Sequence, residues 1–224
     1  MTAPDRTPIG PPEMVERAAG RLGELALRAV GDHYEIIANG VFLMDTRNGE
    51  SERLLVRLAL GGAPERARLA IGGLGIGFSL AEALRSDRCE RVTVVELEPK
   101  IVEWGRTRLS RWSGNALADP RVEIVVEDFA TWLIRDQDSL DAIALDVDNG
   151  PAWTVADANA ALYDDAGLAR LRGRLKPGGR LAIWSAAEVE GFAERLARAF
   201  ERVEIVRVPV PRGEPDVVYL ATRG

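Results

Sequence analysis

The chain has 224 residues, 46% of them hydrophobic and 29% charged, which is typical of a soluble chain with one large domain, and no apolar run is long enough to span a bilayer. Its 29 basic and 35 acidic residues give a net charge of −6, which disfavours a nucleic-acid partner because phosphate contacts need a basic surface. A single cysteine, Cys89, excludes an intrachain disulfide, and together with the single histidine, His33, it cannot complete a tetrahedral zinc site.

The sequence divides into three parts. Residues 1–13 contain four prolines and few apolar residues, which predicts a flexible tail without a signal-peptide core. Residues 14–62 form a small N-terminal segment, and residues 63–224 form a catalytic domain of nucleoside-binding type. From this organisation we expect a cytoplasmic protein that binds neither a membrane nor a metal ion.

The N-terminal segment is expected to contain two helices and a β-hairpin. Apolar residues recur at helical spacing over 14–30, which predicts the first helix. Two β-rich runs over 33–45 flank Asn39-Gly40, the dipeptide most typical of a two-residue hairpin loop. The pattern returns to a helix over 50–60.

From residue 66 onward, short apolar runs alternate with amphipathic segments. The runs predict strands at 67–71, 91–96, 121–128, 141–146 and 180–184. The amphipathic segments predict helices at 79–86, 99–110, 129–136, in the stretch up to 175, and at 187–200, with a turn at 177–179. Because the strands are apolar on both faces and separated by helices, they indicate a parallel sheet covered by helices on both sides.

The last two predicted strands have a different connection. The runs 202–210 and 216–222 are separated by only five residues, too few for a crossover helix, so these strands must be antiparallel. Five βα units closed by an antiparallel hairpin resemble the class I S-adenosylmethionine (SAM)-dependent methyltransferase fold. This Rossmann-like α/β fold implies a mostly parallel, seven-stranded sheet over about residues 66–224.

A glycine-rich turn follows the first strand of the catalytic domain, at Gly72, Gly73, Gly75 and Gly77. Glycine lets the backbone turn sharply and approach a ligand closely. Glu96 ends the next strand, where a carboxylate can accept both ribose hydroxyls of a nucleoside, and Leu97 follows it at the same site. The Gly-x-Gly-x-Gly spacing is that of SAM enzymes, since a dinucleotide site needs a glycine where Phe78 stands. The alternative is a tight turn that binds no ligand.

The third strand also ends on an acid. Asp128 is followed by Phe129, and in SAM-type folds an acid here receives the adenine amino group while an apolar neighbour lies beside the ring. The alternative is that Asp128 only caps the helix predicted at 129–136. Both roles use the same strand end, so both remain open.

The loop after the fourth strand concentrates polar residues. Asp146, Asp148 and Asn149 come where this strand leaves the sheet, at the edge where ligands of open α/β sheets bind. Trp153 could form a wall of an acceptor pocket. The alternative is an Asx-turn with helix caps. We expect Asp146 beside both the donor and the acceptor, and the other three residues on the acceptor side.

These motifs together resemble the spermidine synthase family and its spermidine-synthase-like relatives over about residues 33–222. The likeness rests on the hairpin, the Gly-Gly turn, the runs VTVVELEP and ADPRVEIVVED, and a DVDNGP loop ending in Gly-Pro-Ala. The resemblance implies that Asp146 is the candidate base for an attacking amine. It also implies that a second acid of the loop, at Asp148 or Asn149, holds that amine, and that the protein forms a homodimer.

Two positions depart from the family pattern. The family's glycine turn carries an acid that reads the amino end of an aminopropyl donor, and Gly75 stands in its place here. The family's Tyr-Gln pair at the start of the helix after the hairpin corresponds to Ser51 and Glu52. A polyamine needs acids spaced along its chain of cations, and Glu52 is a further candidate on the acceptor side.

The sequence therefore predicts a transferase that uses SAM or decarboxylated SAM to alkylate a small nucleophile such as an amine or polyamine. Because the acid at Gly75 is missing, we expect methyl transfer rather than its alternative, aminopropyl transfer. The catalytic candidates are Asp146 and Asp148. An alternative of another class is a SAM- or nucleoside-binding protein that has lost catalysis. A nicotinamide oxidoreductase is opposed by the glycine spacing and the terminal hairpin.

Overall fold

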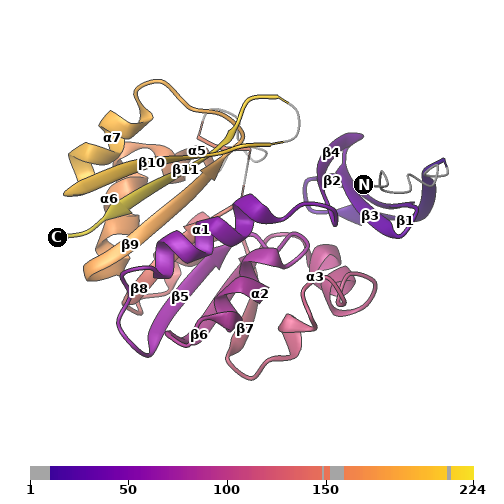
Figure 1. Ribbon diagram of the computed structural model, residues 1–224, viewed down its shortest axis with the longest axis horizontal. Helices are drawn as coiled ribbons and strands as arrows, with labels where there is room; N and C mark the ends of the chain where they lie inside the picture. The colour runs from indigo at the N-terminus through magenta and orange to yellow at the C-terminus, as the bar shows by residue number, and fades with distance from the viewer. Residues whose placement is uncertain (1–10, 148, 152–158, 211–212) are drawn as a thin grey trace, which may run out of the picture. The chain divides into compact units, whose positions relative to one another are not determined.

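The computed structural model describes residues 11–147, 149–151, 159–210 and 213–224 of the chain (Figure 1). The contacts divide the chain into an N-terminal unit, Met1–Asn48, and a larger unit, Gly49–Gly224. Over the described ranges, no helix has both the length and the apolar character needed to cross a membrane.

The N-terminal unit is a four-stranded antiparallel sheet with the order β1-β2-β3-β4. Its strands are β1 (Glu13–Gly20), β2 (Gly23–Val30), β3 (His33–Ala38) and β4 (Val41–Asp45). The helix expected over 14–30 is wrong, because β1 and β2 form a hairpin there whose turn at 21–22 is bracketed by glycines. Pairing with β3 buries Leu25 and Leu27. The strand register overrides the helical spacing of the apolar residues.

The hairpin at 33–45 is present as β3 and β4, and both turn residues have positive φ angles, 49° at Asn39 and 79° at Gly40. The expected tail ends before β1, since Glu13 already belongs to that strand, and residues 1–10 lie outside the described part. Glu35 of β3 is buried and paired with Arg28 at 2.5 Å and with Arg47 at 2.6 Å.

The larger unit is built on a seven-stranded sheet with the order β10-β11-β9-β8-β5-β6-β7. Its strands are β5 (Ala67–Gly72), β6 (Cys89–Glu96), β7 (Val122–Val126), β8 (Leu140–Leu145), β9 (Leu175–Ser185), β10 (Arg202–Val208) and β11 (Asp216–Thr222). Strands β5 to β9 pair in parallel, whereas β11 runs antiparallel to both β9 and β10. The expected fold, a mostly parallel sheet with an antiparallel terminal hairpin, is confirmed.

Helices cover both faces of this sheet (Figure 1). They are α1 (Glu50–Leu60), α2 (Phe78–Arg85), α3 (Pro99–Arg106), the 3₁₀ turn η1 (Ala116–Ala118), α4 (Phe129–Arg135), α5 (Ala160–Tyr163), α6 (Asp165–Arg174) and α7 (Phe192–Ala199). Helices α1 and α2 pack together on one face, and α4, α6 and α7 enclose the main apolar core on the other. Helix α1 packs on β8, β9 and β11, so it belongs to the larger unit rather than to the N-terminal segment in which the sequence placed it.

Two predicted elements differ in position from those in the structure. The expected helix at 187–200 begins only at Phe192, because Gly191 before it adopts a left-handed conformation with φ 73°. The expected turn at 177–179 lies inside β9, as an irregularity in its register with β8. Neither change alters the direction of a strand. The carboxyl ends of β5, β6 and β8 therefore meet at one edge, as a parallel sheet requires.

Candidate nucleoside and amine site

The glycine turn lies at the carboxyl end of β5. Gly73 and Gly77 have φ angles of 86° and 92°, in the left-handed region that favours glycine, and Gly77 is the N-cap residue of α2. A Cβ atom on Gly73 would overlap the backbone carbonyl oxygen of Asp146. The turn thus lets two strand ends approach more closely than a side chain would allow.

Glu96 at the end of β6 is 8% exposed and held by backbone amides. The Leu74 N–H donates to its Oε2 at 2.7 Å, and the Glu98 N–H donates to its Oε1 at 2.8 Å. Burial raises the pKa of Glu96, while these hydrogen bonds act in the opposite direction. A carboxylate has about four acceptor positions, so each oxygen retains capacity for a ribose hydroxyl. These free acceptor positions fit the ribose hydroxyls of an adenosyl group.

Asp128 is the N-cap residue of α4. Its Oδ1 accepts hydrogen bonds from the Thr131 N–H and hydroxyl, each at 2.8 Å, so the capping role is present. Phe129 is buried and packs against Trp132, with the ring centroids 5.2 Å apart. A Cβ atom on Gly72 would come within 2.9 Å of the Phe129 ring, which places this ring beside the glycine turn. Leu97 is half-buried between β6 and α3.

Asp146 follows β8 directly and is half-buried. Its N–H donates to the Gly72 carbonyl oxygen at 2.9 Å, which ties the start of the loop to the end of β5. The Asn149 carbonyl oxygen accepts a hydrogen bond from the Ala186 N–H at 3.1 Å, just after β9. Asp148 and Trp153 lie outside the described residues. The structure therefore brings Asp146 to the glycine turn and anchors Asn149 near β9.

Glu52 lies in the first turn of α1, close to α2. The Ser79 hydroxyl donates to the Glu52 carbonyl oxygen at 3.1 Å, and the Ser51 hydroxyl donates to the Glu52 carboxylate at 3.1 Å. Burial raises the pKa of Glu52, and the negative charge of Asp216 raises it further.

Asp216 is a residue that sequence reasoning did not select. It begins β11, and because β11 runs antiparallel to β9, its first residue returns to the carboxyl edge of the parallel strands. The five-residue connection before it already required antiparallel strands. A strand that runs antiparallel to the others begins at the edge where the parallel strands end, so Asp216 must lie at that edge. This inference from the sequence could have identified it.

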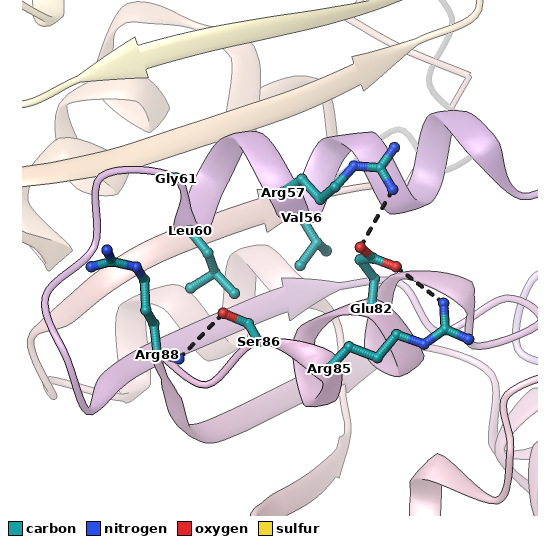
Figure 2. Close-up of a pocket in the computed structure, with 8 residues that line it drawn as sticks. All are labelled: Val56, Arg57, Leu60, Gly61, Glu82, Arg85, Ser86 and Arg88. Atoms are coloured by element: carbon teal, nitrogen blue, oxygen red, sulfur yellow. Dashed lines mark hydrogen bonds and ion pairs between the residues drawn. The ribbon is translucent and has the colours of Figure 1, made fainter.

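A surface hollow of about 230 Å³ lies elsewhere on the larger unit, between the second halves of α1 and α2 (Figure 2). Arg57 and Arg85 both point to Glu82 there, at 3.4 and 3.5 Å. Its lining includes Ser86 and Arg88, which precede the beginning of β6, and no residue at the carboxyl end of that strand. This hollow is therefore separate from the site built on Glu96 and Asp146.

Comparison with known proteins identifies related sequences. Residues 51–191 match the spermine/spermidine synthase domain. The chain is 33% identical over 169 residues to polyamine aminopropyltransferase 2 of Pseudomonas aeruginosa, covering 70% of this chain and 46% of that protein. It is 25% identical over 229 residues to the polyamine aminopropyltransferase of Aeropyrum pernix, covering 93% and 68% of the two chains. The chain thus spans less than half the length of the Pseudomonas relative.

Solved structures show the same fold. A spermidine synthase in complex with the transition state analogue AdoDATO superimposes with a TM-score of 0.81 at 17% identity, covering 95% of this chain and 74% of that chain. The spermidine synthase from Thermotoga maritima gives 0.75 at 16% identity, covering 95% and 73%.

The expectation of methyl transfer is wrong, because the curated relatives are named polyamine aminopropyltransferases. That expectation rested on the missing carboxylate at Gly75 alone. The sequence pattern could not show which other carboxylates the fold brings to the same edge, and Asp216 is one of them.

Proposed function

The chain belongs to the spermine/spermidine synthase domain family, and from this premise we propose that it transfers an aminopropyl group from decarboxylated SAM to an amine. The observation that carries the proposal is the junction of the glycine turn with Asp146. There the Asp146 N–H donates a hydrogen bond to the Gly72 carbonyl oxygen. The Asp146 carbonyl oxygen lies so close to Gly73 that a Cβ atom on Gly73 would overlap it. A group bound by Glu96 at this turn therefore lies beside the first residue of the Asp-rich loop.

The adenosyl end of the donor is assigned to Glu96 and the turn. Both oxygens of Glu96 are fixed by backbone N–H groups, so the carboxylate is oriented before a ligand arrives. We assign Asp128 to the adenine amino group, with Phe129 and Leu97 as the apolar neighbours. Asp128 keeps its capping bonds to Thr131 in this role, because its second oxygen remains an additional acceptor.

Asp146 is assigned to the attacking amine. Decarboxylated SAM supplies an electrophilic carbon bonded to its sulfonium sulfur. The amine nitrogen forms a bond to that carbon, the carbon–sulfur bond breaks with its electron pair left on sulfur, and the amine proton passes to Asp146 or to water. Because Asp146 follows a rigid strand, it can align the amine before reaction. We assign Asn149, Asp148 and Trp153 to the acceptor side of the same loop, and the acceptor class to small amines and polyamines.

The test is Asp146→Asn, which keeps the size of the side chain and removes its charge. The turnover of decarboxylated SAM with a panel of diamines should fall about 100-fold or more, while the affinity for methylthioadenosine changes little. Turnover is followed by the release of methylthioadenosine and its affinity by calorimetry. Near-normal turnover in the variant would assign Asp146 a structural role only. A wild-type protein that binds methylthioadenosine but transfers nothing to any amine would refute the proposed activity.

A further inference from the structure

Glu52 and Asp216 face each other from two elements that are far apart in the sequence. Helix α1 packs against both β9 and β11, and β11 begins with Asp216 at the carboxyl edge of the sheet. Ser51, which is 5% exposed, lies between the two acids: its hydroxyl donates to the Glu52 carboxylate at 3.1 Å and is also within reach of the Asp216 carboxylate. The backbone of Glu52 is tied to Ser79, two residues after Gly77. The pair therefore lies beside the glycine turn.

Among the described residues, the donors near the two carboxylates are neutral groups: the Ser51 hydroxyl, the Glu52 N–H and the Trp184 Nε1–H. The Ser51 hydroxyl has one proton and can satisfy only one of them at a time. The Trp184 Nε1–H is buried and has no hydrogen-bond partner among the residues that the structure describes, although it is close enough to Asp216 to favour its ionised form. Burial raises the pKa of both acids, and the charge of Asp216 adds to the shift at Glu52. Arg53, whose charge favours the ionised form of Glu52, lies over the Phe78 ring, 4.4 Å from its centroid.

An ammonium group would complete this arrangement. It carries three N–H donors and one positive charge, so a single group can donate to both carboxylates and relieve their repulsion. The turn from Gly72 to Phe78 contains no acid of its own, and the backbone of Glu52 is tied to Ser79 in the helix that follows it.

We propose that Glu52 and Asp216 together bind a primary ammonium group of the substrate, beside the glycine turn. This inference rests on the proposed function, which supplies two such groups: the amino end of the aminopropyl donor and the distal amine of a diamine acceptor. Both present the same chemistry to the pair. The pair thus determines specificity through charge, without contacting the reacting carbon.

The experiment compares Asp216→Asn, Glu52→Gln and the double variant with the control Glu50→Gln. Glu50 is in the same helical turn, but its side chain is 60% exposed and paired with Arg57. Calorimetry is carried out with decarboxylated SAM, with methylthioadenosine, which lacks the ammonium group, and with 1,4-diaminobutane or 1-aminobutane in the presence of methylthioadenosine. Circular dichroism and melting temperature show that each variant is folded.

The double variant should bind one ammonium ligand at least 10-fold more weakly, while methylthioadenosine affinity changes less than about 2-fold and the control behaves as wild type. Weaker binding of decarboxylated SAM assigns the pair to the donor. Weaker binding of the diamine, but not of the monoamine, assigns it to the acceptor. These readouts need no turnover, so the inference can hold even if the proposed transfer fails. Unchanged affinity for both ligands, or a wild type that binds neither, would overturn it.

Discussion

Glu96 is a buried carboxylate whose position is fixed before any ligand binds. Two backbone amides hold its oxygens at 2.7 and 2.8 Å, and the residue is 8% exposed. Its burial raises its pKa above the ordinary value of 4.5, so the folded protein retains this proton at a pH where the unfolded chain has lost it. The residue that we assign to the ribose therefore reduces the stability of the free protein at neutral pH.

This reduction predicts a pH dependence of stability. Between pH 4.5 and the raised pKa, the folded state binds more protons than the unfolded state, so the contribution of Glu96 to stability falls as the pH rises. Glu96→Gln removes the titration. The free energy of unfolding of the wild type relative to this variant should therefore decrease with rising pH, by up to about 1.4 kcal/mol per pH unit within this window. Urea unfolding at a series of pH values measures it. A difference that does not depend on pH would contradict the raised pKa.

At the scale of a single element, the glycine turn depends on close approach as well as on backbone freedom. Gly73 and Gly178 both have positive φ angles, 86° and 79°, but only at Gly73 would a Cβ atom meet another part of the chain. Gly178 is open, with no heavy atom within 4 Å of such a Cβ.

The two glycines therefore form a matched pair for mutation. Gly178→Ala should cost about 1–2 kcal/mol, the strain of a left-handed residue. Gly73→Ala should cost a further 1–3 kcal/mol or so, because the Asp146 carbonyl oxygen must move, and it should abolish methylthioadenosine binding. Chemical denaturation and calorimetry measure the two effects. Equal costs, with binding retained in both variants, would show that the approach to Asp146 is not needed.

A comparison of two helix caps can separate the contribution of Asp128 to stability from its contribution to binding. Asp128 caps α4 through the Thr131 N–H at 2.8 Å, and Asp164 caps α6 through the Gly167 N–H at 2.7 Å. Replacing either acid by alanine should destabilise the protein by about 1 kcal/mol. Only Asp128→Ala should also weaken methylthioadenosine binding, because we assign only Asp128 to the adenine. If both variants bind as wild type, Asp128 is a cap alone.

The helices and strands of the larger unit could be predicted because its strands contain short, mainly apolar runs that alternate with amphipathic segments. The same reasoning failed over 14–30, where Leu, Ala, Glu and Arg all favour helices. There the pairing of β2 with β3 decides the structure, and the sequence shows it only as two glycines around the turn at 21–22. Local patterns predict structure best where they agree with long-range pairing.

The candidate site was predictable where its residues follow motifs. Glu96 ends β6, Asp146 directly follows β8, and both lie at the predicted edge. Asp216 was missed because no local motif distinguishes an acid between a turn and a strand. Its significance comes from Glu52 and Ser51, which are more than 160 positions away in the sequence and meet it only through the packing of α1 on β11. Such contacts depend on sheet order, which a linear pattern does not contain.

At the scale of the whole molecule, the chain forms two compact units, and we expect damage to one of them to remain local. Glu35 is the centre of an ion-pair network in the N-terminal unit, with Arg28 at 2.5 Å and Arg47 at 2.6 Å. Glu35→Gln leaves both guanidinium groups without their buried anion and should cost this unit about 1–3 kcal/mol.

Hydrogen exchange measures the prediction. Amides of β2 to β4 should exchange faster in Glu35→Gln, while amides of β5, β6 and β8 keep their protection. Glu24→Gln is the control, because Glu24 pairs with Arg17 on the surface, where such pairs contribute less than about 1 kcal/mol. Faster exchange throughout both units would show that they unfold together.

The order of strands in the large sheet also determines when it can be completed on the ribosome. Strand β11 follows β10 in the sequence, yet it lies between β9 and β10 in the sheet (Figure 1). Until β11 has emerged, β9 presents an unpaired edge and β10 has no strand of this sheet to join. Nascent chains that stop before Asp216 would therefore carry an open, apolar strand edge, which is the feature that recruits chaperones and promotes aggregation.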